Sequence, residues 1–345
     1  MNCLAEGILI IVPSSAPVFV TGATGFVGSA VARALLARGQ TLRLLVRRGS
    51  DRSNLAGLDA ELVEGDLRDA ASLARAVRGC AGLFHVAADY RLWVPDPERM
   101  MQANVAGTRD LMRAAQRAGV QRIVYCSSVA ALGQIGDGTP ADENTPNDPA
   151  KIVGVYKKSK YLAEQAVLDL VRTEELPAVI VNPSTPVGPR DIKPTPTGKT
   201  IRDAALGKMP AYIDTGLNIV HVDDVAAGHL LAYDHGRVGE RYILGGEDFL
   251  LRDLLRLIAE VSGQRPPLCA LPIPALWPLA VGCEWAARAF GIDPLVTREM
   301  LMMARKKMFF SSAKARAELG YLPRPARAAI EDAVAWFGAH GKNAV

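Results

Sequence analysis

Short apolar runs alternate with helical patterns along the first half of the chain, and this alternation leaves few folds open. The strand-like runs are 18–20, 41–46, 61–63, 83–86, 122–126 and 178–181, and the clearest helical patterns between them are 29–38, 107–118 and 157–172. Strands separated by helices form a parallel sheet with right-handed crossovers. Most of the runs are nearly all apolar, which is typical of strands covered on both faces. The sequence therefore predicts an α/β fold built on a doubly wound parallel sheet.

The composition changes after Pro183, which indicates a second part of the chain. Residues 183–198 read PSTPVGPRDIKPTPTG and are rich in Pro, Thr and Gly, so we expect a loop that leaves the first domain. Beyond it we expect short helices and strands at 218–222 and 241–244. The expected division is a first domain over 17–182, with returning segments near 217–246, and a smaller C-terminal lobe over 183–216 and 247–345.

Two apolar stretches are too short or too interrupted to span a membrane. In residues 1–16 the apolar core, 8–12, is short, whereas a span needs about 20 residues. We expect a disordered leader there. Residues 268–290 are interrupted by prolines and charged residues. We expect a buried or interfacial helix near 275–290, with a lipid-facing or substrate-facing role as the alternative, and no transmembrane segment.

Charge and cysteine content exclude several classes of function. The 345 residues carry 40 Lys and Arg and 36 Asp and Glu, a net charge of +4 without a block of like charges, so no nucleic-acid partner is expected. The five cysteines contain no CxxC pair, so we expect neither a disulfide framework nor a metal site. Free thiols suit a reducing compartment. We therefore expect a cytoplasmic protein, with a peripheral position at the membrane as the alternative.

A glycine-rich turn follows the first strand-like run. Residues 18–28 read VFVTGATGFVG, and three glycines stand there between a strand and a helix. In such a turn one glycine allows the sharp bend, one lets the backbone approach a pyrophosphate, and one lets the helix pack on the strand. The helix N-terminus supplies N–H groups to the phosphates. We therefore predict a dinucleotide site formed by Gly22, Thr24, Gly25, Phe26, Val27 and Gly28.

The end of the second strand indicates which dinucleotide binds. An acidic residue there bonds the adenosine ribose of NAD, whereas an arginine accommodates the 2′-phosphate of NADP. This chain has Arg47 and Arg48 at that place, with plain surface charge as the alternative explanation. We therefore favour NADP(H) over NAD(H). Asp66, after the third strand, is placed to meet the adenine edge or to cap the strand, and Leu67 and Ala87 are also expected in the cofactor site.

A tyrosine and a lysine four residues apart carry the expected chemistry. Residues 156–160 read YKKSK, which places Tyr156 and Lys160 on one face of a helix. A fixed ammonium favours the phenolate and lowers the tyrosine pKa from its ordinary value of about 10. Tyr156 could then exchange a proton with an alcohol or a carbonyl while hydride moves to or from a nicotinamide.

Several polar residues are expected to reach the substrate. Ser127 and Ser128 follow the buried run 122–126 at the carboxyl end of the sheet, where ligands of open α/β sheets bind. Ser128 is expected to orient the substrate oxygen with Ser127 beside it, and capping of the next turn is the alternative for either. Asp89 and Tyr90 are expected in a lid or a packed surface loop. The last candidate, Arg190 in the exit loop, would clamp an anionic substrate group or bond loop carbonyls.

Six segments together resemble the extended short-chain dehydrogenase/reductase superfamily, in its NAD-dependent epimerase/dehydratase group. They are TGATGFVG, HVAA at 85–88, ANVAGT at 103–108, YCSS at 125–128, YKKSK and VNPST at 181–185. The resemblance covers about 18 to 340. It implies an NAD(P)-binding Rossmann domain over 17–182, a C-terminal substrate-binding lobe and, often, a homodimer.

The same resemblance implies roles for individual residues. Tyr156 would be the acid/base, Lys160 would bind the nicotinamide ribose, and Ser128 would be the catalytic serine. Asn104 matches an asparagine that helps to shape the active site. The segment expected to lie against the nicotinamide is Pro183 and Ser184.

At finer grain the chain looks most like the hopanoid-associated sugar epimerase family and is also similar to dihydroflavonol reductases. The stretches that carry this likeness are HVAADYRLWVPDP at 85–97, NPSTPVGPRDIKPTPTG at 182–198 and MPAYIDTGLNIVHVDDVAAGH at 209–229. Sugar dehydratases of the superfamily usually carry Thr-Asp-Glu where this chain has Ser128, Val129 and Ala130, so dehydration is disfavoured.

Three functions follow as hypotheses. The leading one is an NADP(H)-dependent oxidoreductase that interconverts a ketone and a secondary alcohol. The first alternative is an NAD-dependent sugar epimerase of hopanoid lipid biosynthesis, which would oxidise and re-reduce a sugar or a lipid-linked sugar without net use of cofactor. The second is a non-catalytic dinucleotide sensor, which the Tyr156 and Lys160 pair disfavours.

Overall fold

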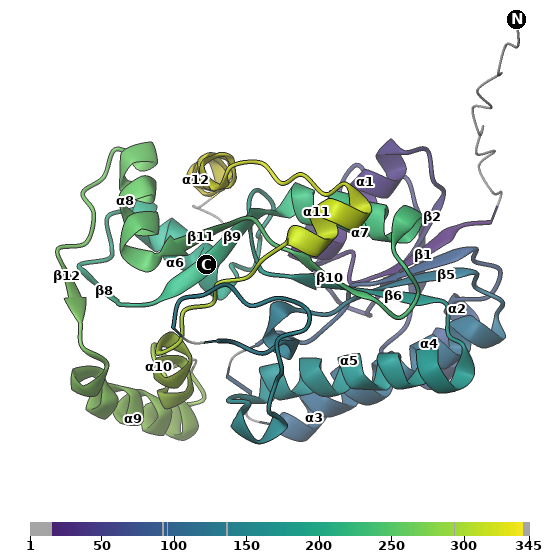
Figure 1. The fold of residues 1–345 in the computed structure, drawn as a ribbon, viewed down its shortest axis with the longest axis horizontal. Coiled ribbons are helices and arrows are strands. Elements are labelled where there is room, and N and C mark those ends of the chain that lie inside the picture. Colours follow the sequence, from purple (N-terminus) through teal and green to yellow (C-terminus); the bar gives the residue numbers. More distant parts are fainter. Residues whose placement is uncertain (1–15, 92, 95, 136, 293, 341–345) are drawn as a thin grey trace, which may run out of the picture.

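A seven-stranded sheet is the largest feature of the computed structural model, which describes residues 16–340 except 92, 95, 136 and 293 (Figure 1). The leader expected over 1–16 lies, apart from Ala16, outside these residues. The strands stand in the order β10-β6-β5-β4-β1-β2-β3, and all neighbours are parallel. Their bounds are β1 Val18–Thr21, β2 Leu42–Val46, β3 Glu61–Glu64, β4 Gly82–His85, β5 Arg122–Cys126, β6 Ala178–Pro183 and β10 Arg241–Leu244.

Helices cover both faces of this sheet. Alternate strand residues point to opposite faces, so Val18 and Val20 enter one core and Phe19 enters the other. This confirms the predicted α/β, Rossmann-like doubly wound sheet. In Figure 1 the helices above the sheet are α1 (Phe26–Ala37), α7 (Val222–His235) and α11 (Ala313–Leu319), and those below it are α2 (Ala70–Ala76), α4 (Gly107–Arg117) and α5 (Val155–Glu174).

The chain after β6 builds a second, smaller group of elements. A three-stranded sheet has the order β11-β9-β7, and β12 pairs with β8. Of the segments expected to return near 217–246, β10 joins the large sheet and β9 belongs to the small one. The bounds are β7 Thr185–Val187, β8 Ala211–Ile213, β9 Gly216–His221, β11 Glu247–Leu250, β12 Cys269–Leu271, α6 Pro196–Ala205, α8 Leu251–Ser262 and α12 Ala326–His340.

Residues 183–198, predicted as a loop, contain β7 and the start of α6. Pro196 occupies the first turn of α6, where its missing N–H costs no helix hydrogen bond. Thr195 caps the helix, because its Oγ1 accepts a hydrogen bond of 3.0 Å from Gly198 N. A proline-rich composition therefore concealed a helix start.

An unusual wide helical turn precedes α4. The chain passes from α3 (Pro97–Met101) through a π-helical turn at Gln102–Ala106 directly into α4. Such turns are rare and are frequent at functional sites. Short 3₁₀ turns lie at Ser53–Leu55, Val129–Ala131 and Pro149–Lys151.

Helices α9 (Ile273–Phe290) and α10 (Arg298–Ala304) pack together at one end of the molecule (Figure 1). The helix expected near 275–290 is thus present, and because it is largely exposed it is not the buried one of the two predicted types, buried or interfacial. Only Ala280, Glu284 and Ala287 of α9 are buried. Within the described part of the chain, no helix is long and apolar enough to cross a membrane.

The two outer strands of the large sheet carry charges on their free sides. On β3, Glu61 and Glu64 are exposed, and Glu61 pairs with Arg43 at 2.7 Å. At the other edge, the buried Glu143 side chain accepts a hydrogen bond of 2.8 Å from Ile243 N of β10. The free side of β10 is therefore occupied by a side chain of the same molecule.

Candidate active site

The glycine-rich turn leaves no room for side chains at two of its glycines. Gly22 has φ +78°, and a Cβ there would lie 2.6 Å from Ala87 N. A Cβ at Gly28 would lie 2.1 Å from the Gly22 carbonyl oxygen. The turn therefore packs against itself and against the backbone that follows β4, which places Ala87 beside it.

The start of α1 is open to an anion. Gly25 is the N-cap and offers no side-chain hydrogen bond, so none of the N–H groups of the first turn is capped by it. Thr24 holds the turn from outside, because its carbonyl accepts a hydrogen bond of 3.2 Å from Asn54 Nδ2. Phe26 and Val27 are partly buried and pack against the core. This arrangement fits the phosphates of a dinucleotide.

Basic and acidic side chains gather where β2, β3 and β4 end. Arg47 and Arg48 are exposed just after β2, and the charge of Arg47 contributes to lowering the pKa of both Asp66 and Asp89. The main cause at Asp66 is Arg68, which lies 2.7 Å away and holds the pKa of Asp66 at about 2. Arg47 thus lies close to the predicted adenosine end of the site.

The backbone of Leu67 is in contact with the neighbouring α4. A Cβ at Gly107 would lie 2.4 Å from the Leu67 carbonyl oxygen. Gly107 therefore allows the loop after β3 to approach the helix that begins there. Leu67 is held near the carboxyl ends of the strands, as expected for a residue of the cofactor site.

Ser128, Tyr156 and Lys160 come together beyond β5. Ser128 begins the 3₁₀ turn Val129–Ala131 and accepts a hydrogen bond of 3.1 Å from Ala130 N. Tyr156, in the first turn of α5, is close enough to the Ser128 side chain for Ser128 to act against the rise in the Tyr156 pKa. Lys160 lies one turn further along α5 and is only 3% exposed. Its Nζ donates a hydrogen bond of 2.8 Å to the Cys126 carbonyl.

The pKa of Tyr156 differs from the sequence expectation. Burial raises it to about 12, although the Ser128 side chain acts in the opposite direction. The Lys160 ammonium is directed to the Cys126 carbonyl and sits 5.0 Å from the centre of the Tyr125 ring. Burial lowers the pKa of Lys160 as well. In this structure desolvation outweighs the expected stabilisation of the phenolate by Lys160.

Asn104 connects the loop after β4 to helix α5. It lies in the π-helical turn. Its Oδ1 accepts a hydrogen bond of 2.7 Å from Asp89 N, and its Nδ2 donates one of 2.8 Å to the Asp89 carbonyl oxygen. The same Nδ2 donates a hydrogen bond of 2.9 Å to Ser159 Oγ. Ser159 Oγ in turn donates a hydrogen bond of 2.8 Å to the Tyr156 carbonyl oxygen. Asn104 therefore supports the first turn of α5 from behind. The sequence prediction that it helps to shape the site has a geometric basis.

The end of β6 presents an unsatisfied hydroxyl. Pro183 is buried at the strand end, and Ser184 N donates a hydrogen bond of 3.2 Å to the Leu244 carbonyl oxygen. The Ser184 Oγ is buried and has no hydrogen-bond partner within the structure. Buried hydroxyl groups are rarely left unpaired. The residues present therefore fit a polar ligand group at this point, as expected for a segment against the nicotinamide.

The predicted substrate residues are only partly brought together. Ser127 is buried beside Ser128, and Tyr90, 42% exposed, is close enough to Asp89 for that charge to contribute to its raised pKa. Arg190 instead pairs with Asp223 of α7 at 2.6 Å. Its guanidinium is thus held at α7, whereas Tyr156 belongs to α5 on the other face of the sheet.

Two acidic residues near the site were missed by sequence reasoning. Asp191 is 2% exposed, and burial raises its pKa to about 6. Its Oδ2 accepts hydrogen bonds from Thr195, whereas its Oδ1 has no partner. Glu299 reaches the start of α5, where a Cβ at Gly154 would lie 2.1 Å from its Oε1. Glu299 is far from Tyr156 in sequence, so no spacing pattern could have revealed it.

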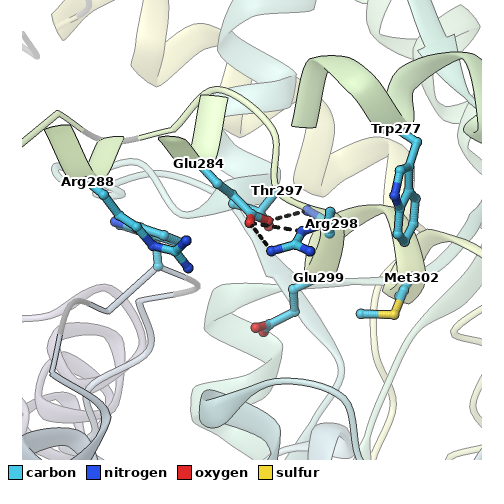
Figure 2. Close-up of a pocket in the computed structure, with 8 residues that line it drawn as sticks. Trp277, Glu284, Arg288, Thr297, Arg298, Glu299 and Met302 are labelled. Atoms are coloured by element: carbon cyan, nitrogen blue, oxygen red, sulfur yellow. Dashed lines mark hydrogen bonds and ion pairs between the residues drawn. The ribbon is translucent and has the colours of Figure 1, made fainter. Parts of the chain in front are cut away.

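A pocket of about 310 Å³ is lined mainly by residues of α9 and α10 (Figure 2). Trp277 of α9 and Met302 of α10 line one end of it, and Glu299 lines the side next to α5. Trp93, from the loop after β4, closes it by stacking 5.7 Å from the Arg288 guanidinium. Among the described residues, no group of His, Cys, Asp or Glu side chains could hold a metal ion.

A family model decides the relationship. The model for the NAD dependent epimerase/dehydratase family matches residues 18–245, which include the glycine-rich turn, Ser128, Tyr156 and Lys160. The chain belongs to this family. The NAD-dependent epimerase/dehydratase family is part of the extended short-chain dehydrogenase/reductases, whose members are enzymes that use nicotinamide dinucleotides. The predicted resemblance and the prediction of an enzyme are confirmed.

Relatives span nearly the full length of the chain. A putative dihydroflavonol 4-reductase of Synechocystis is 45% identical over 94% of this chain and 95% of its own. The sterol demethylase protein B of Methylococcus capsulatus is 37% identical over 93% of this chain and 98% of its own. Among solved structures, the crystal structure of gox2253 is 64% identical, with a TM-score of 0.86, over 95% of this chain and 99% of its own.

Proposed function

We propose that this member of the NAD-dependent epimerase/dehydratase family is an NADP(H)-dependent reductase that interconverts a ketone and a secondary alcohol. The observation that carries the proposal is the approach of the Tyr156 and Ser128 side chains, with Lys160 one helical turn away. These three groups lie beyond the carboxyl end of β5, where ligands of open α/β sheets bind. The cofactor, when bound, supplies or accepts the hydride.

The protonation state of Tyr156 favours the direction of reduction. With a pKa of about 12 its hydroxyl is protonated at neutral pH and is ready to donate a proton to a carbonyl oxygen. Ser128 would hold the same oxygen and fix its position. Lys160 would bind the nicotinamide ribose, and Pro183 and Ser184 would face the nicotinamide.

We propose NADP(H) as the cofactor because of Arg47. It is exposed beside the end of β2, and its charge reaches Asp66 and Asp89 at the neighbouring strand ends. A 2′-phosphate in this position would form charge-assisted hydrogen bonds with Arg47 and Arg48. Phe26, Val27 and Gly28 would give their backbone N–H groups to the pyrophosphate.

We propose an apolar ketone as the substrate class. The pocket between α9 and α10 has three large apolar side chains, Trp93, Trp277 and Met302, which suit an apolar ring system or chain, and its other lining residues are polar or charged. The 37%-identical relative whose name refers to sterols supports this choice. The smaller part of the chain, over 183–216 and 247–345, would then be the substrate-binding lobe, with Asp89, Tyr90 and Ser127 at its boundary.

We also propose that the protein is a cytoplasmic homodimer. The cysteines among the described residues are free, and Cys80 and Cys126 are buried, which suits a reducing compartment. Light scattering coupled to gel filtration tests the dimer. A mass near the 36.9 kDa of one chain would overturn that part of the proposal.

Nucleotide content and cofactor affinity test the proposed reaction. Protein purified without added cofactor is denatured, the released nucleotide is identified, and NADPH and NADH are titrated by fluorescence. We expect an empty or exchangeable site that binds NADPH at least tenfold more tightly, and NADPH consumption with ketones. Retained, non-exchanging NAD without net turnover would instead indicate an epimerase, the alternative that would act on a sugar or a lipid-linked sugar of hopanoid biosynthesis.

A further inference from the structure

Helix α9 is apolar apart from Glu284 and Arg288, and yet it is largely exposed. Its buried residues form one narrow stripe of Ala280, Glu284 and Ala287. Away from this stripe Trp285 is 67% exposed and Phe290 is 71% exposed. A helix that is apolar all round is normally buried or inserted in lipid. We call the α9 surface the group of exposed apolar side chains on and around this helix: Leu268, Leu279, Trp285, Phe290, Ile292 and Leu295.

The segment that carries the α9 surface is basic. Residues 264–310 contain six Lys and Arg but three Asp and Glu, so most of the net charge of +4 of the chain resides there. Two of the acidic side chains are directed inward: Glu284 pairs with Arg298 at 2.8 Å, and Glu299 lies against Gly154. Arg305 and Lys306, in contrast, are exposed after α10. The segment around the apolar surface, which we call the basic rim, therefore carries a net positive charge.

We propose that the α9 surface docks onto an anionic lipid bilayer, with α9 lying in the plane of the interface. Exposed Trp and Phe side chains beside basic residues are typical of helices that rest at the headgroup level. Each Lys or Arg near an anionic bilayer adds to the attraction between protein and lipid. A second copy of the chain is a poorer occupant, because a symmetric contact would bring two positive rims together.

The α9 surface is continuous with the pocket between α9 and α10. Trp277 and Arg288 of α9 line that pocket (Figure 2), and Glu299 on its other side touches Gly154, two residues before Tyr156. Given the proposed function, which this step assumes, a docked enzyme would receive its apolar ketone from the bilayer through this pocket. Docking itself does not depend on the reaction.

Sedimentation with vesicles tests the proposal on the full-length chain. Wild-type protein is mixed with vesicles of phosphatidylcholine alone or of phosphatidylcholine with phosphatidylserine. We expect binding to the anionic vesicles that weakens at high salt. The double variant Trp285→Glu with Phe290→Glu should bind at least tenfold less. The matched control, Leu322→Glu, changes a side chain that is 80% exposed near α11 and should bind as the wild type does.

Two further measurements show whether a loss of vesicle binding reflects the loss of the docking surface. Circular dichroism and thermal melting must show that the double variant is folded, and its activity on a water-soluble ketone should stay unchanged, which separates docking from the proposed reaction. Absence of vesicle binding by wild-type protein, or equal binding by the double variant, would overturn the proposal. A fall in oligomer mass in the double variant would instead assign the surface to a second copy.

If wild-type protein binds vesicles, the basic rim can be tested separately. Arg305→Glu with Lys306→Glu should remove the preference for phosphatidylserine while leaving weak binding to neutral vesicles. Unchanged preference for anionic lipid would show that the positive rim has no part in docking, contrary to the proposal.

Discussion

The Lys160 ammonium and the Cys126 carbonyl are joined by a hydrogen bond of 2.8 Å between α5 and the end of β5. This bond fixes Lys160 at the edge of the sheet, one turn from Tyr156. Burial raises the pKa of Tyr156 to about 12, so its hydroxyl is protonated at neutral pH. In this structure the Tyr156 hydroxyl therefore holds its proton more tightly than a free tyrosine does.

Replacing Tyr156 by Phe should abolish turnover while leaving the fold and cofactor binding in place. The change removes the proposed proton donor, and general acid catalysis contributes about 10²- to 10⁴-fold. We expect a fall in kcat of at least about 100-fold, measured by NADPH consumption with a ketone, and an NADPH affinity within about twofold of wild type. Loss of affinity together with activity would point to misfolding instead.

Replacing Arg47 and Arg48 by Ala should weaken the binding of NADPH and leave the binding of NADH unchanged. The lost charge-assisted hydrogen bonds to the 2′-phosphate correspond to about 1.4 kcal/mol or more, a tenfold rise in the NADPH dissociation constant. Arg52→Ala is a suitable control, because Arg52 is also exposed nearby and pairs with Glu64. If both cofactors weaken equally, the two arginines have no part in selecting the phosphate.

The turn at Gly22 should tolerate no side chain. Gly22 and Gly39 have similar positive φ angles, +78° and +74°, but only Gly22 has backbone atoms where a Cβ would stand. Gly39→Ala should therefore cost only the backbone strain of about 1 kcal/mol. Gly22→Ala should lower the free energy of unfolding by about 3 kcal/mol or more and abolish NADPH binding. If urea unfolding shows that Gly22→Ala and Gly39→Ala lose the same free energy of unfolding, this packing argument is contradicted.

Asp191 should make the protein less stable as pH rises. Its folded pKa of about 6 lies above the ordinary Asp value, so the folded state binds the proton more tightly than the unfolded state. Ionisation of Asp191 therefore lowers the free energy of unfolding by about 3 kcal/mol. The loss develops between about pH 4 and 6 and is complete above that range. Asp191→Asn removes this cost and keeps an oxygen for Thr195 N.

Urea unfolding at two pH values measures this effect. Asp191→Asn should be more stable than wild type at pH 8 and nearly equal to it at pH 4. A variant that is less stable at pH 8 would show that the charged form of Asp191 is the one the fold favours.

The buried strands were the easiest part to predict, because each is a continuous apolar run with one role. The strands at Arg122–Cys126 and Arg241–Leu244 have the predicted bounds. The π-helical turn at Gln102–Ala106 left no sign in the sequence, since its residues are ordinary helix formers. The start of α6 was concealed by prolines that elsewhere break helices.

The site was predictable where its residues lie close together in sequence or at strand ends. The glycine-rich turn and the spacing of Tyr156 and Lys160 are local patterns, so they could be read directly. The pKa of Tyr156 could not, because it depends on how deeply folding buries the hydroxyl. Asp191 and Glu299 depend on tertiary packing alone, and the pairing of Arg190 with Asp223 connects two distant segments.

The protected edges of the large sheet restrict how two copies of the chain can associate. Pairing of strands across a subunit boundary needs a free row of backbone groups. Glu143 already accepts the hydrogen bond of Ile243 N on β10. At the other edge, Glu61 and Glu64 would bring like charges together if two β3 strands met. Association by extension of the large sheet is thus disfavoured at both of its outer strands, so the strand ends beside α5 keep their geometry without help from a second copy.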